Sequence, residues 1–315
     1  IKDVTANYYG ENEVSLSVQS AFEDFIYLGV FSPSGWIPVD IAINNKGNVT
    51  FKNLEPNIIY QPLVSDGQNH QAVGYPFIYT KKKNYILKPD VNKLKKAVLQ
   101  RKMSVCGGYK DFPHRGIIGS QIEASLYKDF SQADLLFRFN DTLRSNYYEL
   151  IPPDINKQYR YIRYVGPPDN IMELAELAVF ADSTGKESLH LNRMNDPLPT
   201  ASLDNITDGD ILSYFSSKDS ACFITYDLGK ITPIQKIVFS PRNDDNYVWP
   251  GDKYELFYQD GTNGWKSLGV QTATRHELEY LVPDKSLLWL RNRTKGREEQ
   301  VFIYKGGKQL FNVDL

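Results

Sequence analysis

The chain of 315 residues has few of the residues from which metal and catalytic centres are commonly built. It contains two cysteines and four histidines, and no two histidines are spaced as a zinc ligand pair. The sequence also has no glycine-rich loop of the kind that holds phosphate groups. We therefore find no motif for zinc or phosphate chemistry.

Charge and hydropathy exclude further classes. The formal net charge is -2, which is too close to zero to indicate nucleic acid or an anionic membrane as a partner. No apolar run approaches the roughly 18 residues of a membrane-spanning helix. The first residue is Ile1 and not methionine, so we expect a processed chain, or a piece of a longer one, whose export signal has been removed.

Aromatic residues and short alternating runs are plentiful. Aromatic residues make up 13% of the chain, including 21 tyrosines, and long helical patterns are rare. Short segments that fit strands recur along the chain, among them ADLLFRF, YYELI, KQYRYIRYV and LAVFA. The sequence therefore predicts an all-β fold of tandem β-sandwiches, with enough residues for each to bury a core.

Changes in pattern along the chain suggest three domains. Residues 1–87 are predicted to form an N-terminal β-sandwich, 104–185 a second sandwich and 186–315 a third. Between the first and second of these, residues 88–103 are predicted to be a linker with a helix near 90–102, because Val91, Leu94, Val98 and Leu99 fit one helical face. The segment 170–181 fits either a strand or a helix. Gly306-Gly307 between two alternating runs predicts a hairpin turn.

A polar loop with two aromatic residues is the strongest candidate for a binding site. Candidate strands at 222–228, 234–239 and 254–258 flank it. Exposed rings can cover the apolar side of a sugar while polar groups bind its hydroxyls. The candidate ligand-binding residues are Arg242, Asn243, Asp244, Asn246, Tyr247 and Trp249. The alternative is structural, with Trp249 under its own loop and Arg242 paired with a neighbouring aspartate.

The last domain resembles the discoidin, or factor V/VIII C-type, superfamily, which includes galactose-binding-like carbohydrate modules. The resemblance is carried by ITDGDILSYF (206–215), FITYDLGKITPIQKIVF (223–239), GDKYELFYQDG (251–261), GWKSLG (264–269) and LLWLRNRTKGREEQVFIY (287–304). Residues 104–182 are similar to it more faintly, as a degenerate copy. The whole chain resembles C-terminal regions of exported Bacteroidetes proteins, some of which carry an upstream transglutaminase-like domain.

This resemblance implies a jelly roll that binds ligands at loops on one end. In many such modules a calcium ion ties the first loop to the last strand. The matching metal-binding positions here are Asp208, Asp210, Ser213 and one of Glu298 or Glu299, of which we take Glu299. Two carboxylates, a hydroxyl and loop carbonyls would suffice for calcium. The alternative is that Asp208 and Asp210 only cap a turn.

A catalytic alternative rests on Cys106 and His114, with Asp111 between them. A cysteine nucleophile needs a histidine within hydrogen-bond reach and a group that stabilises the oxyanion, and no such group is recognisable. A hydrolase or acyl transferase is therefore the weakest of the hypotheses.

The sequence as a whole favours a non-catalytic, carbohydrate-binding region of an exported bacterial protein, periplasmic or on the cell surface. Its expected partners are a glycan or polysaccharide and an upstream domain of the same polypeptide, without nucleic acid or membrane insertion. Calcium is its only expected cofactor. The alternative is an architectural or protein-binding β-sandwich.

Overall fold

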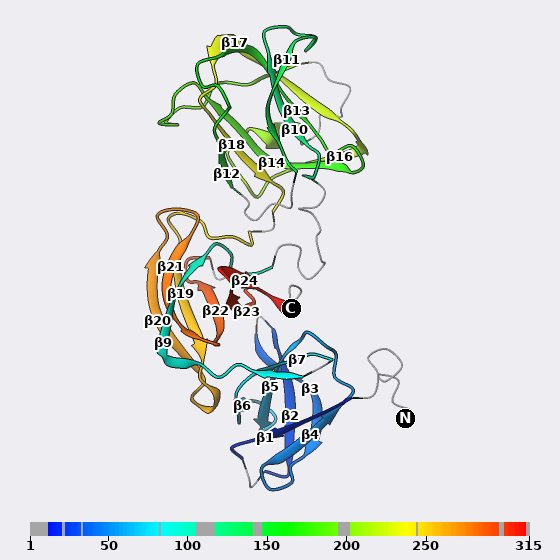
Figure 1. Ribbon diagram of the computed structural model, residues 1–315, viewed down its shortest axis with the longest axis vertical. Coiled ribbons are helices and arrows are strands. Elements are labelled where there is room, and N and C mark those ends of the chain that lie inside the picture. Colours follow the sequence, from blue (N-terminus) through cyan, green and yellow to red (C-terminus); the bar gives the residue numbers. More distant parts are fainter. Residues whose placement is uncertain are drawn as a thin grey trace. The chain divides into compact units, whose positions relative to one another are not determined.

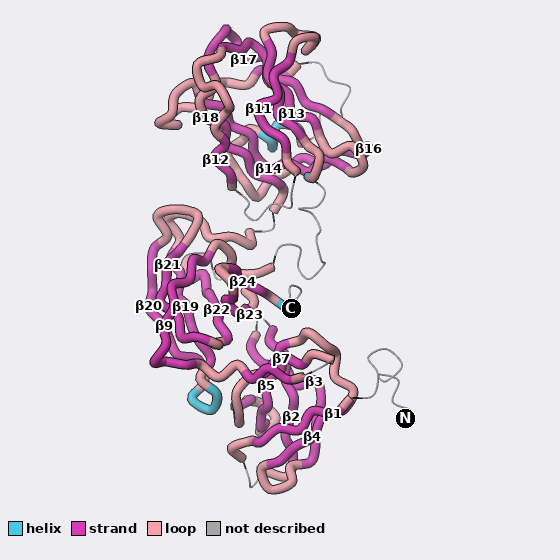
Figure 2. The backbone as a smooth tube through the Cα atoms, in the orientation of Figure 1, coloured by secondary structure: helices cyan, strands magenta, loops and turns pink. Residues whose placement is uncertain are grey.

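The protein is described from a computed structural model that covers residues 12–20, 23–32, 34–81, 83–104, 117–140, 147–194, 202–243, 245–295 and 299–312. The described chain is nearly all β, as predicted, and its helices are short 3-10 turns such as η2 (Leu203–Ile206) and η3 (Gly261–Asn263) (Figure 2). None of the described helices has the length and hydrophobicity that crossing a membrane requires. The chain divides into two compact units (Figure 1): unit 1 is 1–104 with 246–315, and unit 2 is 105–245.

Unit 1 begins with two antiparallel sheets. The larger has the strand order β3-β2-β5-β7-β8, with β6 beside β5, and the smaller pairs β1 with β4. The bounds are β1 Glu13–Ser17, β2 Phe25–Ser32, β3 Gly35–Ile43, β4 Asn48–Lys52, β5 Ile59–Ser65, β6 His70–Ala72, β7 Phe77–Tyr79 and β8 Asn84–Ile86. Their core includes Val14, Ile26 and Phe51. These strands occupy the range predicted for the N-terminal sandwich.

The rest of unit 1 is a second pair of sheets, with strand orders β20-β19-β22-β23-β24 and β21-β9. The bounds are β9 Asp90–Leu99, β19 Lys253–Gln259, β20 Trp265–Thr272, β21 Leu278–Asp284, β22 Leu287–Asn292, β23 Val301–Lys305 and β24 Lys308–Leu310. Leu99, Leu256 and Leu290 are among its buried core residues. The predicted turn at Gly306-Gly307 is confirmed, since both residues have positive φ between β23 and β24.

The helix predicted near 90–102 is wrong, because those residues form strand β9. It pairs antiparallel with β21, from Leu99 opposite Leu278 to Asp90 opposite Asp284. Leu99 is fully buried, whereas Leu94 is 54% exposed, which is the reverse of what the helical face required of Leu94. Pairing with a distant strand overrides the local helical periodicity.

An aromatic cluster joins the two sheet pairs within unit 1. Trp36 and Trp265 lie nearly parallel, with ring centroids 6.4 Å apart, and Trp289 lies 5.4 Å from Trp265. Phe31 makes edge contacts with all three rings. Three of the four tryptophans of the chain therefore serve packing between sheets.

Unit 2 is a sandwich of a five-stranded sheet, β11-β10-β13-β17-β15, and a four-stranded sheet, β12-β18-β14-β16. The bounds are β10 Gln121–Ser125, β11 Ala133–Arg138, β12 Tyr148–Leu150, β13 Gln158–Val165, β14 Ile171–Phe180, β15 Asn192–Arg193, β16 Phe215–Ser220, β17 Phe223–Pro233 and β18 Lys236–Pro241. Ile162, Leu177 and Phe239 are among the side chains buried between the sheets. The ambiguous segment at 170–181 is thus a strand, β14.

The domain boundary predicted between 185 and 186 does not match this pairing. Strand β17 pairs with β13, and β18 pairs with β14, so the segment 215–241 completes the sandwich that begins at β10. The sequence from 246 onward pairs instead with β9 and belongs to unit 1. The predicted domains 104–185 and 186–315 are therefore replaced by an inserted unit 2 within a discontinuous unit 1.

Candidate functional site

The predicted binding loop is divided between the two units. Unit 2 ends at Asp245 and unit 1 resumes at Asn246. Asp244 lies outside the described residues. Arg242 and Asn243 therefore belong to one unit, and Asn246, Tyr247 and Trp249 belong to the other.

In unit 2, the loop side chains are bound to their own sandwich. The Arg242 guanidinium lies 2.6 Å from the Glu173 carboxylate and 4.2 Å from the centroid of the Tyr214 ring. The Asn243 amide is buried and donates to the Ile211 carbonyl oxygen at 2.7 Å. The arginine braces the loop, as in the structural alternative, and Glu173, which pairs with it, comes from β14.

In unit 1, the predicted stacking rings are held in packing contacts. Tyr247 is 2% exposed and forms an isolated β-bridge with Arg101. Asn246 is buried and donates to the Ser104 carbonyl oxygen at 2.9 Å. The half-buried Trp249 meets the His276 ring edge to face, with centroids 4.7 Å apart. This geometry leaves Tyr247 without an exposed ring face for a sugar.

The predicted calcium ligands are also divided. Asp208 and Asp210 lie after η2 in unit 2, where Asp208 accepts a hydrogen bond from the Ser213 hydroxyl at 2.7 Å. Asp208 also accepts from the Asp210 amide at 2.8 Å, which is a turn-capping bond. Glu299 belongs to unit 1, where its carboxylate accepts from the Asn292 amide at 3.0 Å. The four residues are thus not one set within either unit.

Glu176 on β14 is the carboxylate that unit 2 brings to the loop of Asp208 and Asp210, and no motif in the sequence pointed to it. Its oxygen accepts from the Gly209 amide at 2.9 Å. Burial, and then the charges of Asp208 and Asp210, raise the pKa of Glu176 to about 7. No group of three or more acidic, histidine or cysteine side chains in the described ranges is placed to hold a metal, so calcium stays a prediction.

The catalytic hypothesis cannot be placed on this structure. Cys106, Asp111 and His114 lie outside the described residues. Hydrolase or acyl transferase chemistry at these residues stays a prediction.

A groove of about 590 Å³ lies on the outer face of the five-stranded sheet in unit 2. Strands β13, β17 and β15 form its floor, and the turn between β10 and β11 forms one wall. The lining residues are Lys128, Asp129, Phe130, Tyr161, Arg163, Asn192, Arg193, Met194, Phe223, Thr225 and Asp227. The groove combines aromatic rings with charged and amide groups, which is typical of a ligand site.

Strand register explains why these side chains meet. Arg163 stands opposite both Glu123 and Thr225, and Tyr161 stands opposite Asp227. Residues paired in this way project from the same face of a sheet. Their neighbours Ile162 and Tyr164 point inward and are buried. The alternation in QYRYIRYV therefore divides β13 between the core and the groove.

Arg163 is fixed from three sides. Its guanidinium donates to Glu123, with 3.1 Å from Nε to the carboxylate oxygen. It also lies 4.3 Å from the centroid of the Phe130 ring and 5.4 Å from that of Phe223. Phe223 is itself 39% exposed. A rigid cationic donor beside an accessible ring is thus part of the groove surface.

Asp227 is fixed in a similar way. The Arg160 guanidinium donates to both carboxylate oxygens of Asp227, at 2.7 Å from Nε and 2.9 Å from Nη2. The Gly229 backbone amide donates to the same carboxylate at 2.7 Å. The side-chain amide of Asn192 donates to the Asp227 carbonyl oxygen at 3.2 Å. These bonds hold polar groups of the groove in place before any ligand arrives.

Comparison with known proteins returned no match among family models, curated proteins or solved structures. The assignment of function therefore depends on the geometry of this chain.

Proposed function

We propose that the protein is a non-catalytic carbohydrate-binding region and that the unit 2 groove, not the loop at 242–249, binds the glycan. The observation that carries the proposal is Arg163, which is held between the Phe130 and Phe223 rings at the surface of an open groove. Two of the segments that resemble discoidin-like modules, 206–215 and 223–239, lie in unit 2 and support the same class of ligand. An exported, periplasmic or cell-surface location is part of the proposal.

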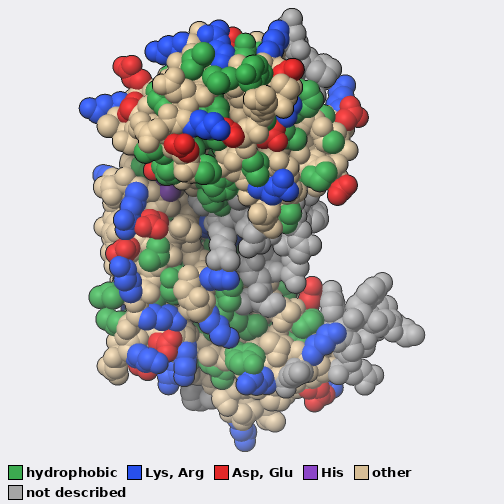
Figure 3. Space-filling view, turned by 45° about the horizontal axis from the view of Figure 1, so that its top comes forward, with side chains coloured by type: hydrophobic (Ala, Val, Ile, Leu, Met, Phe, Trp, Pro, Cys, Tyr) green, Lys and Arg blue, Asp and Glu red, His purple; other side chains and the backbone are tan. Residues whose placement is uncertain are grey.

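The chemistry of the groove suits a sugar. The exposed ring of Phe223 offers an apolar surface to the C–H face of a pyranose. Asn192, Thr225 and Arg193 add amide, hydroxyl and guanidinium groups that suit sugar hydroxyls. Positively and negatively charged groups both line the groove, and charges of both signs are interspersed on the face seen in Figure 3. A neutral or weakly charged glycan is therefore the expected ligand.

Glycan arrays followed by calorimetry with the intact chain would test this function. We expect Phe223→Ala to weaken binding of the selected glycan at least about tenfold, because one stacking ring is worth more than about 1 kcal/mol. Tyr127→Ala is the matched control, since Tyr127 is a 50% exposed ring on the turn between β10 and β11 but does not line the groove. The absence of any glycan binding, or equal losses in both variants, would reject the proposal.

A second candidate is an architectural or protein-binding role, and the outer face of β2 and β3 favours it. Side chains that alternate along the edge strand β3, together with one on β2, are between 45% and 74% exposed: Phe25, Ile37, Val39, Ile41 and Ile43. Such an apolar face is typical of an interaction surface. If this role is correct, we expect Ile41→Lys to abolish association of the chain through this face, measured by sedimentation. Unchanged sedimentation of the variant would reject the role.

A further inference from the structure

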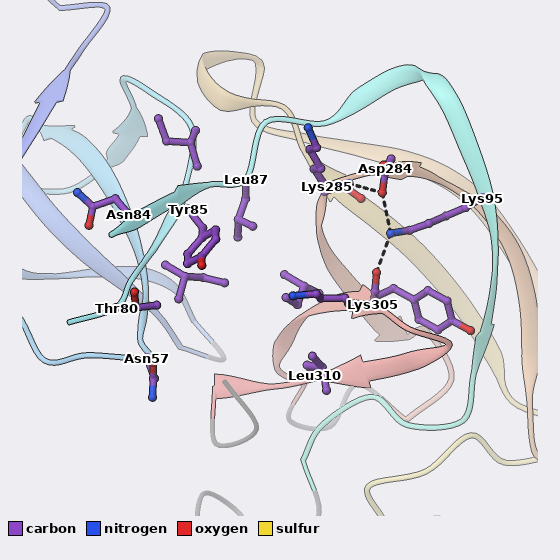
Figure 4. A pocket seen from close by; sticks show the side chains of 15 residues that line it. Asn57, Thr80, Asn84, Tyr85, Leu87, Lys95, Asp284, Lys285, Lys305 and Leu310 are labelled. Carbon is purple, nitrogen blue, oxygen red and sulfur yellow. Dashed lines mark hydrogen bonds and ion pairs between the residues drawn. The ribbon is translucent and has the colours of Figure 1, made fainter. Parts of the chain in front are cut away.

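Unit 1 contains a second and larger pocket, of about 720 Å³ (Figure 4). It lies between strands β7 and β8 on one side and strands β23 and β24 with the β21–β22 turn on the other. The lining residues are Asn57, Ile78, Thr80, Asn84, Tyr85, Ile86, Leu87, Lys95, Asp284, Lys285, Ser286, Ile303, Tyr304, Lys305 and Leu310. None of them belongs to the unit 2 groove.

The charges of this pocket are unequal. Three lysines, Lys95, Lys285 and Lys305, line it against one carboxylate, Asp284. The Lys95 ammonium lies 3.0 Å from Asp284 and donates to the Tyr304 carbonyl oxygen at 2.7 Å. Figure 4 marks the contact between Lys95 and Asp284 with a dashed line. Lys93 reaches the same carboxylate at 3.1 Å from outside the lining. Among the described residues that line the pocket, Asp284 is the single carboxylate, and it is already neutralised.

The other two ammonium groups have no such partner. Within the described chain, neither Lys285 nor Lys305 makes an ion pair, and both residues are exposed. Lys285 is held at a sharp turn with φ 58°, which the Ser286 hydroxyl closes by donating to the Pro283 carbonyl oxygen at 2.7 Å. Lys305 ends β23, and in Figure 4 its side chain extends toward Tyr85. Lys285 and Lys305 therefore place two positive charges at the pocket that have no ion-pair partner among the described residues.

The opposite wall is neutral and contains an aromatic ring. Tyr85 is 46% exposed, and Thr80 and Asn57 add a hydroxyl and an amide. The Lys83 ammonium lies 4.5 Å from the centroid of the Tyr85 ring, which adds a further positive charge near the pocket. An apolar ring beside hydroxyl-binding groups suits a sugar better than a simple inorganic anion.

We propose that this pocket binds an acidic saccharide, a sugar that carries carboxylate or sulfate groups. The lysines act as point charges for the anionic groups, and Tyr85 contacts the ring of the sugar. The attraction is strengthened because the pocket walls exclude part of the solvent that would otherwise screen it. The proposal is independent of the unit 2 groove, which uses other residues and suits a neutral ligand.

The test uses the intact chain with three polymers: polygalacturonate for carboxylate, dextran sulfate for sulfate and unmodified dextran as the neutral reference. Lys285→Ala with Lys305→Ala should weaken binding of the anionic polymer at least about tenfold in calorimetry. The control double variant is Lys266→Ala with Lys308→Ala, which removes two exposed lysines of unit 1 outside the pocket, one of them opposite Lys305 on the same hairpin. It should change affinity less than about twofold.

Two further variants separate the outcomes. Tyr85→Ala should weaken binding of polygalacturonate or dextran sulfate while binding of inorganic sulfate is unchanged. Phe223→Ala in unit 2 should have no effect on binding of either anionic polymer. A response to only one of the two anionic polymers would identify the acidic group and support the proposal. Equal losses in both lysine double variants, binding of neutral dextran with the same affinity, or no binding of either anionic polymer would overturn it.

Discussion

At the scale of single residues, the loop at 242–249 shows how polar side chains that suit a ligand can be used by the fold itself. Arg242 and Asn243 have the chemistry of a sugar site, yet their hydrogen-bonding groups contact Glu173 and the Ile211 carbonyl oxygen. A polar group that leaves water needs such a partner, because its desolvation otherwise costs about 1–3 kcal/mol. The residue type therefore does not distinguish a binding role from a structural one.

Replacing Arg242 should affect stability and not glycan binding. Arg242→Ala leaves the carboxylate of Glu173, whose side chain is 10% exposed, without its cation. We expect a loss of about 1–3 kcal/mol in the free energy of unfolding, measured by chemical denaturation. Adding Glu173→Gln should recover part of the loss. A variant of normal stability that no longer bound glycan would instead restore the loop as the binding site.

The contribution of the Asp284 ion pairs to stability can be tested by varying the pH. Hydrogen bonds from Lys95, and then from Lys93, lower the pKa of Asp284 to about 2 from 3.8. Because the pKa is lower in the folded state, the stabilisation is complete above about pH 4 and is lost as the pH falls toward 2. Asp284→Asn should be less stable than the parent at neutral pH, by less than about 1 kcal/mol since the pair is partly exposed. Thermal unfolding between about pH 4 and pH 2 should show the difference in stability between parent and variant vanish. A difference that stays constant with pH would contradict the ionic explanation.

At the scale of the element, β9 shows that a helical period can occur in a strand. The predicted helix would have buried Leu94 and Leu99 on the same face, whereas the strand buries Leu99 and leaves Leu94 at the surface. The strand forms in place of the helix because the backbone groups of β21 pair with β9 along its length. Because this partner lies about 180 residues further along the chain, the sequence around β9 carries no pattern that indicates the pairing.

Two leucine substitutions distinguish the strand from the helix. Leu99→Ala removes a fully buried side chain and should cost about 2–5 kcal/mol. Leu94→Ala changes a side chain that is 54% exposed and should cost less than about 0.5 kcal/mol. Urea denaturation of both variants provides the measurement. Similar losses at the two positions would argue for the helix.

At the scale of the whole molecule, the main feature is the insertion of one unit into the other. Strand β9 precedes unit 2 in the sequence, and its partner β21 follows it. The sandwich of β9 and β19–β24 therefore cannot be completed until the chain has passed through the inserted unit. Unit 2, by contrast, draws all of its strands, β10–β18, from one continuous segment.

Fragments of the chain test this architecture. We expect residues 105–245 to fold alone, since β10–β18 and their core are present. The fragment 186–315 should not unfold cooperatively, because it lacks β9 and the partners β13 and β14 of its first strands. Circular dichroism during thermal unfolding would compare them. A cooperative transition in the second fragment with none in the first would restore the boundary predicted from sequence.

The sequence by itself determined the class of the fold and many of its strands. The sequence predicted strands at 222–228, 234–239 and 254–258, which are observed as β17, β18 and β19, although β17 continues beyond Gly229 to Pro233. Gly306-Gly307 predicted its hairpin, because positive φ is a local requirement. These features depend on neighbours in the sequence, and so the pattern of residues records them.

Only the tertiary structure decided which strands pair and which polar residues face a ligand. The partner of a strand edge is set by long-range hydrogen bonds and shared burial, which no short pattern encodes. Arg163 and Tyr161 looked like ordinary strand residues until β10 and β17 placed Glu123, Thr225 and Asp227 opposite them. Arg242 looked like a ligand-binding residue until β14 placed Glu173 beside it. A binding site is a set of distances in space, and the fold is what sets those distances.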